Sequence, residues 1–143
     1  MKMKTAPAFA ALLLASACAT YEEIRTMEPI ESRTVAGDYR ALAECFADRE
    51  RVAVGGGMHI VHSVQPADRT ARVSAAPLSM LGSPTASYSY DVAFAQQAPD
   101  AVSVQLRSLH TIWGTPIAGE EWFDRVSGCA TALRHQAVSP AQR

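Results

Sequence analysis

The sequence predicts an α+β domain: a two-layer sandwich in which an antiparallel four-stranded meander sheet is flanked in sequence by two helices (α-β-β-β-β-α). Near each end, apolar residues recur at three- and four-residue steps, which is typical of amphipathic helices. Between these ends, four segments alternate apolar and polar residues, which is typical of strands with one buried face. Because a sheet face and a helix stripe each need a cover, we expect both helices on one face of the sheet.

The first helix is expected from about Tyr39 to Arg49. Asp38 suits its N-cap, because a carboxylate there accepts a backbone N–H of the first turn. Residues 51–54 are expected to begin a strand that Gly55-Gly56-Gly57 interrupts.

Four further segments are expected as strands, with turn residues at 66–68 and 97–100. Alternation within each segment sets which side chains share a face. The residues expected on the inward face are Met58, Ile60, His62 and Val64 in 58–64; Ala71, Val73 and Ala75 in 69–75; Tyr88, Tyr90, Val92 and Phe94 in 87–95; and Val102, Val104 and Leu106 in the last strand, toward Ile112.

The second helix is expected from Glu120 to about Arg134. Glu120 and Glu121 suit its first turn, because negative charge is favoured at the positive end of a helix dipole. The single α+β domain is expected to span residues 34–137, followed by a C-terminal tail at 138–143.

Composition and charge exclude several classes of protein. The chain has 143 residues, of which 48% are hydrophobic, and a net charge of -1. These values fit one small globular domain better than a disordered or multi-domain chain. Nucleic-acid binding normally requires clustered Lys and Arg, and the sequence has no such cluster, so we expect no nucleic-acid partner.

Residues 1–17 have the three zones of an export signal peptide. Lys2 and Lys4 make the start basic, an apolar run of 12 residues spans 6–17, and small residues lead to Cys18. The apolar run is shorter than the roughly 20 residues that a membrane-spanning helix needs. We therefore expect a cleaved signal rather than a transmembrane anchor.

The junction Leu14-Ala15-Ser16-Ala17-Cys18 resembles the lipobox of bacterial lipoproteins. In that class, small residues precede a cysteine that is acylated, with chains such as palmitate, and becomes the mature N-terminus. A typical lipobox has Leu three residues before the cysteine, where this chain has Ala15. Ala15-Ser16-Ala17 also fits ordinary signal peptidase, so secretion without lipid is the alternative. The resemblance covers only residues 1–18 and implies lipidation at Cys18.

The same resemblance implies a location. Several acyl chains hold a protein durably on a membrane. In many Gram-negative lipoproteins an Asp after the lipidated cysteine favours inner-membrane retention, and this chain has Ala19. We therefore expect an outer-membrane protein that faces the periplasm. Residues 18–33 are expected to form the lipidated N-terminus and a tether, with a short strand near Ile24 as the alternative.

Cysteine arithmetic supports this interpretation. Assigning Cys18 to lipid leaves Cys45 and Cys129, which permit one connectivity. Each lies on the apolar face of its own expected helix, and an oxidising periplasm would let the bond persist. We therefore expect a Cys45–Cys129 disulfide. Two buried free thiols, or a catalytic or metal-binding thiol, are the alternatives.

Motifs for catalysis or cofactor binding are missing from the sequence. Gly55-Gly56-Gly57 is not followed by the Lys-Ser/Thr of a P-loop, and no G-x-S-x-G motif occurs. His59 and His62 would point to opposite faces of a strand, which prevents them from chelating one metal ion. We expect no catalytic residue, cofactor or metal.

The aromatic residues are expected to lie mostly in the core. Where they remain uncovered, Tyr88, Tyr90 and Trp113 are candidates for a partner-binding surface. The first functional hypothesis is a non-catalytic, lipid-anchored envelope accessory protein that binds another protein or an envelope polymer. The alternatives are a small exported hydrolase, which needs a deep polar pocket, and a periplasmic small-ligand carrier, which needs an internal cavity.

Overall fold

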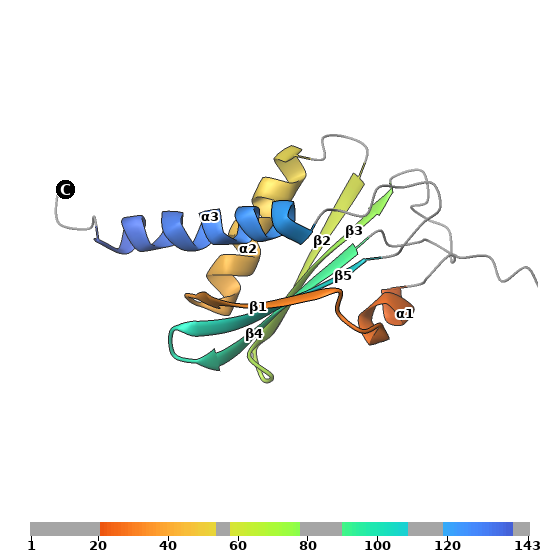
Figure 1. The fold of residues 1–143 in the computed structure, drawn as a ribbon, viewed down its shortest axis with the longest axis horizontal. Coiled ribbons are helices and arrows are strands. Elements are labelled where there is room, and N and C mark those ends of the chain that lie inside the picture. Colours follow the sequence, from red (N-terminus) through yellow and green to blue (C-terminus); the bar gives the residue numbers. More distant parts are fainter. Residues whose placement is uncertain (1–20, 54–57, 78–89, 109–118, 139–143) are drawn as a thin grey trace, which may run out of the picture.

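The computed structural model describes residues 21–53, 58–77, 90–108 and 119–138. These ranges form an α+β fold with one five-stranded antiparallel sheet and three helices (Figure 1). In chain order the elements are α1 (Tyr21–Thr26), β1 (Glu31–Ala36), α2 (Tyr39–Ala53), β2 (Met58–Gln65), β3 (Thr70–Pro77), β4 (Tyr90–Ala98), β5 (Ala101–Ser108) and α3 (Gly119–Val138). The α+β class is as expected, but the described sheet has five strands instead of four.

The additional strand is β1, which lies at an edge of the sheet. The strand order is β1-β5-β4-β3-β2, so β2 to β5 follow one another as neighbours and β1 pairs antiparallel with β5. The β1–β5 register runs from Glu31 opposite Leu106 to Ala36 opposite Ala101. β1 lacks the alternation that identifies the other strands, because Val35 is its one buried residue. Its first half falls within the segment for which we expected a tether, and α1 lies there too.

The helices α2 and α3 lie together over one face of the sheet and cross each other in Figure 1. We call this side of the sheet the first face. Its buried strand residues alternate as expected: Val35, Ile60, Ala71, Val73, Ala75, Tyr90, Val92, Phe94, Val102, Val104 and Leu106. The helices cover them with side chains at three- and four-residue steps: Tyr39, Leu42, Ala43, Phe46 and Ala47 from α2, and Trp122, Val126, Cys129 and Ala130 from α3.

The helix α2 begins at Tyr39, as the sequence predicts, but it ends at Ala53 instead of at Arg49. Asp38 Oδ1 accepts hydrogen bonds from the backbone N–H groups of Arg40 at 2.9 Å and Ala41 at 3.1 Å, which confirms the N-cap. The expected strand start at 51–54 is wrong for residues 51–53, which continue α2. The buried side chain of Glu50 keeps this last turn against the core, so the helix does not end at Arg49.

One glutamine side chain connects the start of α2 to the β4–β5 hairpin. Gln96 Oε1 accepts from Tyr39 N at 2.9 Å, and Gln96 Nε2 donates to Gly37 O at 3.0 Å and Ala98 O at 2.6 Å. Gly37 has a φ of 142°, a conformation that residues with a Cβ rarely adopt. Gln96 therefore stabilises the turn through which the chain leaves β1 and enters α2.

We expect Gln96→Ala to lower the free energy of unfolding by about 2 kcal/mol, because several partly buried backbone groups lose their partner together. Urea denaturation followed by circular dichroism measures this. Gln97→Ala is the matched control, since Gln97 is exposed, and it should change stability by less than about 0.5 kcal/mol. Equal effects of the two substitutions would contradict the role assigned to Gln96.

Candidate functional site

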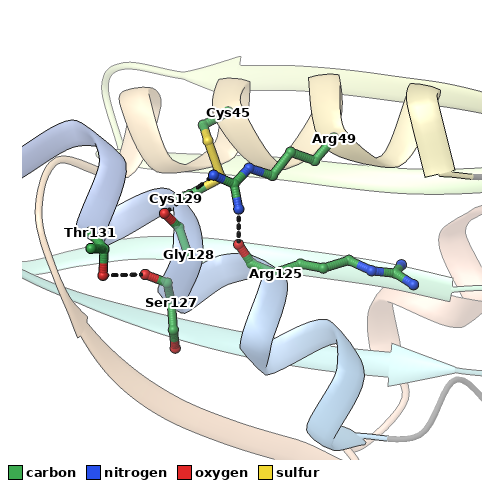
Figure 2. Close-up of a disulfide and its surroundings, with 7 residues drawn as sticks. All are labelled: Cys45, Arg49, Arg125, Ser127, Gly128, Cys129 and Thr131. Carbon is green, nitrogen blue, oxygen red and sulfur yellow. Dashed lines mark hydrogen bonds between the residues drawn. A yellow bond between two sulfur atoms is a disulfide. The ribbon is translucent and has the colours of Figure 1, made fainter. Parts of the chain in front are cut away.

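A disulfide joins the two long helices. Cys45 of α2 and Cys129 of α3 are bonded at an S–S distance of 2.05 Å, with Cα atoms 5.9 Å apart and a sequence separation of 84 residues (Figure 2). The structure thus confirms the expected pairing. Both cysteines within the described ranges are used in this bond, so neither offers a thiol for catalysis or for a metal.

Arg49 adds a second connection beside the disulfide. Its guanidinium reaches from α2 to α3, where Nη1 donates to Arg125 O at 3.5 Å and Nη2 donates to Gly128 O at 3.3 Å (Figure 2). A Cβ on Gly128 would lie 2.5 Å from Arg49 Nη1. The glycine therefore permits the close approach of this side chain to the α3 backbone.

We expect the double substitution Cys45→Ala and Cys129→Ala to lower Tm by about 15 °C or more. In the chain-entropy estimate, opening a loop of 84 residues costs roughly 4 kcal/mol of stability. Calorimetry on oxidised, reduced and substituted protein measures the effect. Cys18→Ala is the control, because it removes a cysteine that is not part of the disulfide. If the oxidised and reduced forms melt together, the bond does not stabilise the domain.

A buried charged network lies under the same two helices. Glu50 of α2 is 1% exposed, and both of its carboxylate oxygens accept hydrogen bonds. Tyr90 Oη of β4 donates to Oε2, and Arg125 Nη1 of α3 donates to Oε1 at 2.7 Å. At 1% exposure the carboxylate is closed off from solvent by the residues around it. The network therefore connects α2, α3 and the sheet.

Tyr90 is the one residue of the expected partner surface that the structure describes. It is 2% exposed and faces the helices, so its burial excludes it from such a surface. Burial, followed by the hydrogen bond to Glu50, raises the pKa of the Tyr90 hydroxyl far above its ordinary value. The hydrogen bond to Glu50 raises the pKa of Arg125, so the cation is also favoured. Tyr88, Trp113 and Cys18 lie outside the described residues.

The network predicts a loss of stability at alkaline pH. Because the folded-state pKa of Tyr90 is raised, its contribution is fully present below the unfolded value of about 10 and is lost as pH rises above it, by up to about 1.4 kcal/mol per pH unit. Urea denaturation at pH 8 to 11 should show this fall in stability in the native protein. Tyr90→Phe should flatten it, while lowering stability at pH 8 by about 1 to 2 kcal/mol. Identical pH dependence in both proteins would show that Tyr90 does not titrate in this way.

The opposite side of the sheet, which we call the second face, carries the alternate residues of the strands. It contains a hollow of about 280 Å³ that we name the arginine hollow. Three arginines line it: Arg25 of α1, Arg72 of β3 and Arg107 of β5. Because Arg25 meets second-face residues here, α1 lies on this side, away from α2 and α3. The other described lining residues are Gln65, Thr70, Ala93, Phe94, Ala95 and Gln105.

A buried carboxylate lies next to the arginine hollow. Asp91 of β4 is 0% exposed, and its oxygens accept from Arg72 Nη2 at 2.8 Å and from Ser74 Oγ at 2.8 Å. Ser74 is 1% exposed. The alternation predicts that Arg72, Ser74 and Asp91 point away from the helices, which is correct. It does not predict their burial, because an alternating pattern gives the face of a residue and not what covers that face.

Unlike Arg72, which pairs with a carboxylate, Arg107 donates its hydrogen bonds to neutral acceptors. Its Nε donates to Met27 O at 2.7 Å and its Nη2 donates to Gln105 Oε1 at 2.9 Å. Both acceptors are neutral, and within the described part of the chain no carboxylate forms an ion pair with Arg107. Burial, and next the positive charge of Arg72, lower the pKa of the Arg107 guanidinium. Arg72 Nε and Arg107 Nη1 are buried without a hydrogen-bond partner.

The two histidines of β2 lie on opposite faces of the sheet, as their spacing predicts. The register places His59 opposite Ala76 and His62 opposite Val73. His62 is half-buried on the first face, and its Nε2 has no hydrogen-bond partner. Among the described residues, no three His, Cys, Asp or Glu side chains are grouped to hold a metal ion.

Comparison with known proteins gives no relative: no family model, curated protein or solved structure matches the chain. The described helices include none with the length and apolar character needed to cross a bilayer. Among the described residues, the arginine hollow has charged and hydrogen-bonding groups that suit a polar ligand.

Proposed function

We propose that the protein is an exported, lipid-anchored envelope protein whose α+β domain is a non-catalytic binding module. The Cys45–Cys129 bond is the observation that carries this proposal. Disulfides persist in oxidising compartments such as the periplasm and are rare in the cytosol. With these two cysteines paired, Cys18 is the remaining cysteine, and it follows a signal-like segment.

The described polar groups favour a binding module over a hydrolase. Glu50 and Asp91 are the fully buried carboxylates of the described ranges, and each has both oxygens hydrogen-bonded to neighbouring side chains. A ligand carrier would need space between the sheet and the helices. That region holds the bulky buried side chains of Phe46, Phe94 and Trp122. We propose that α2, α3 and the sheet form the two layers and that ligands contact the second face.

The start of α1 limits the distance between domain and membrane in this proposal. Only Ala19 and Thr20 separate Cys18 from Tyr21, the first residue of α1. Three residue steps span at most about 10 Å. A lipid on Cys18 would therefore hold α1, and with it Arg25 and the arginine hollow, close to the bilayer surface.

Intact mass of protein made in a lipoprotein-competent bacterial host tests the anchor. We expect a chain that starts at Cys18, carries the added mass of acyl chains and sediments with membranes. Cys18→Ala should abolish acylation, because it removes the thiol that receives lipid. The matched control is the Cys45→Ala and Cys129→Ala pair, which should stay acylated. A soluble, unacylated native chain would overturn the lipid anchor.

A further inference from the structure

One arginine of the hollow, Arg107, has no ion-pair partner among the described residues. Its described lining includes three guanidinium groups and no acidic side chain. The buried Asp91 beside it pairs with Arg72 alone, at 2.8 Å. Arg107 has hydrogen bonds only to neutral oxygens among its described contacts. Arg25 pairs with Glu22 at 3.4 Å, so Arg107 is the arginine of the hollow that has no ion pair within the described ranges. An arginine stays protonated at neutral pH, so this guanidinium keeps its positive charge.

Two arginine N–H groups beside the hollow also have no hydrogen-bond acceptor. Arg72 Nε and Arg107 Nη1 are buried donors without acceptors, and a buried unpaired donor is costly. The Arg72 side chain is 16% exposed and lines the hollow. Neutral groups that can bond a second part of a ligand lie beside the cations, on Gln65, Thr70 and Gln105.

We propose that the arginine hollow binds a compact oxyanion, a phosphate or carboxylate group, between Arg72 and Arg107. The planar guanidinium fork matches such groups, because two parallel N–H donors meet two oxygens of one anion. The oxyanion site depends only on the contacts above. Its position at a membrane surface, where lipid phosphates would be one source of ligand, rests on the proposed function.

Arginine Nε–H NMR signals of the purified full chain test the site directly. The protein is titrated with sodium phosphate, and separately with sodium acetate, at constant ionic strength set with sodium chloride. We expect saturable shifts of the Arg72 and Arg107 signals. Arg51, which pairs with Asp48 on α2, should not shift. Proportional, non-saturating shifts of all arginines, or no shift, would overturn the proposal.

Substitutions give a second readout. Arg107→Gln should weaken phosphate binding about tenfold or more, because it removes charge-assisted hydrogen bonds. Arg51→Gln is the matched control, with the same change of charge on an exposed α2 side chain, and should bind as the native protein does. Arg107→Lys keeps the charge but lacks the fork, so its binding should be intermediate. It also replaces Arg107→Gln if that variant does not fold. Equal loss in Arg107→Gln and Arg51→Gln would mean non-specific charge attraction and would overturn the site.

Vesicle sedimentation distinguishes the sources of the oxyanion. Cys18→Ala, which lacks the acylated residue, is mixed with phosphatidylglycerol vesicles. Sedimentation that Arg107→Gln abolishes supports the site with a lipid headgroup as ligand. Binding of free phosphate without sedimentation supports the site with a soluble ligand. If the protein neither binds free phosphate nor sediments with the vesicles, the proposed oxyanion site is overturned. Because the anchor is tested by mass and the hollow by NMR, either can fail while the other stands.

Discussion

The bond between Cys45 and Cys129 is the constraint on which the rest of the structure depends. It joins the helices that precede and follow β2 to β5 along the chain, so it closes a loop around most of the sheet. Helices α2 and α3 share the cover of the first face, and neither would bury that face alone. Arg49 and Glu50, in the turn after Cys45, add polar contacts to α3. Covalent and polar contacts thus fix the same helix pair.

Two buried carboxylates are satisfied in similar ways on opposite faces of the sheet. Glu50 on the first face accepts from Tyr90 and Arg125, and Asp91 on the second face accepts from Arg72 and Ser74. Each binds one hydroxyl and one guanidinium: Glu50 joins Tyr90 of β4 to Arg125 of α3, whereas both partners of Asp91 lie on the neighbouring strand β3. Breaking such a pair leaves an uncompensated charge in the interior, which is far more costly than losing an exposed ion pair. These contacts therefore favour one arrangement of the elements over others of similar apolar packing.

Much of the fold could be predicted because its signals are local. The Asp38 cap and the alternation in β3 and β5 depend on spacing along the chain. The cysteine pairing is a long-range contact that could be predicted because only two cysteines remain once Cys18 is assigned to lipid. The elements that the sequence did not predict depend on contacts between segments far apart in the chain. β1 is a polar edge strand that forms through backbone pairing to β5, and the last turn of α2 continues because Glu50 meets Arg125, 75 residues away. Glu50 did carry a signal, since it continues the three- and four-residue steps of Leu42, Ala43 and Phe46.

The arginine hollow shows the same limit for function. Its arginines are scattered along the sequence, at positions 25, 72 and 107, and the antiparallel pairing of β3, β4 and β5 brings two of them to the second face beside Asp91. α1 adds the third, and Met27, just after α1, accepts from Arg107 at 2.7 Å. The backbone that follows α1 is thus bonded to an arginine of the hollow.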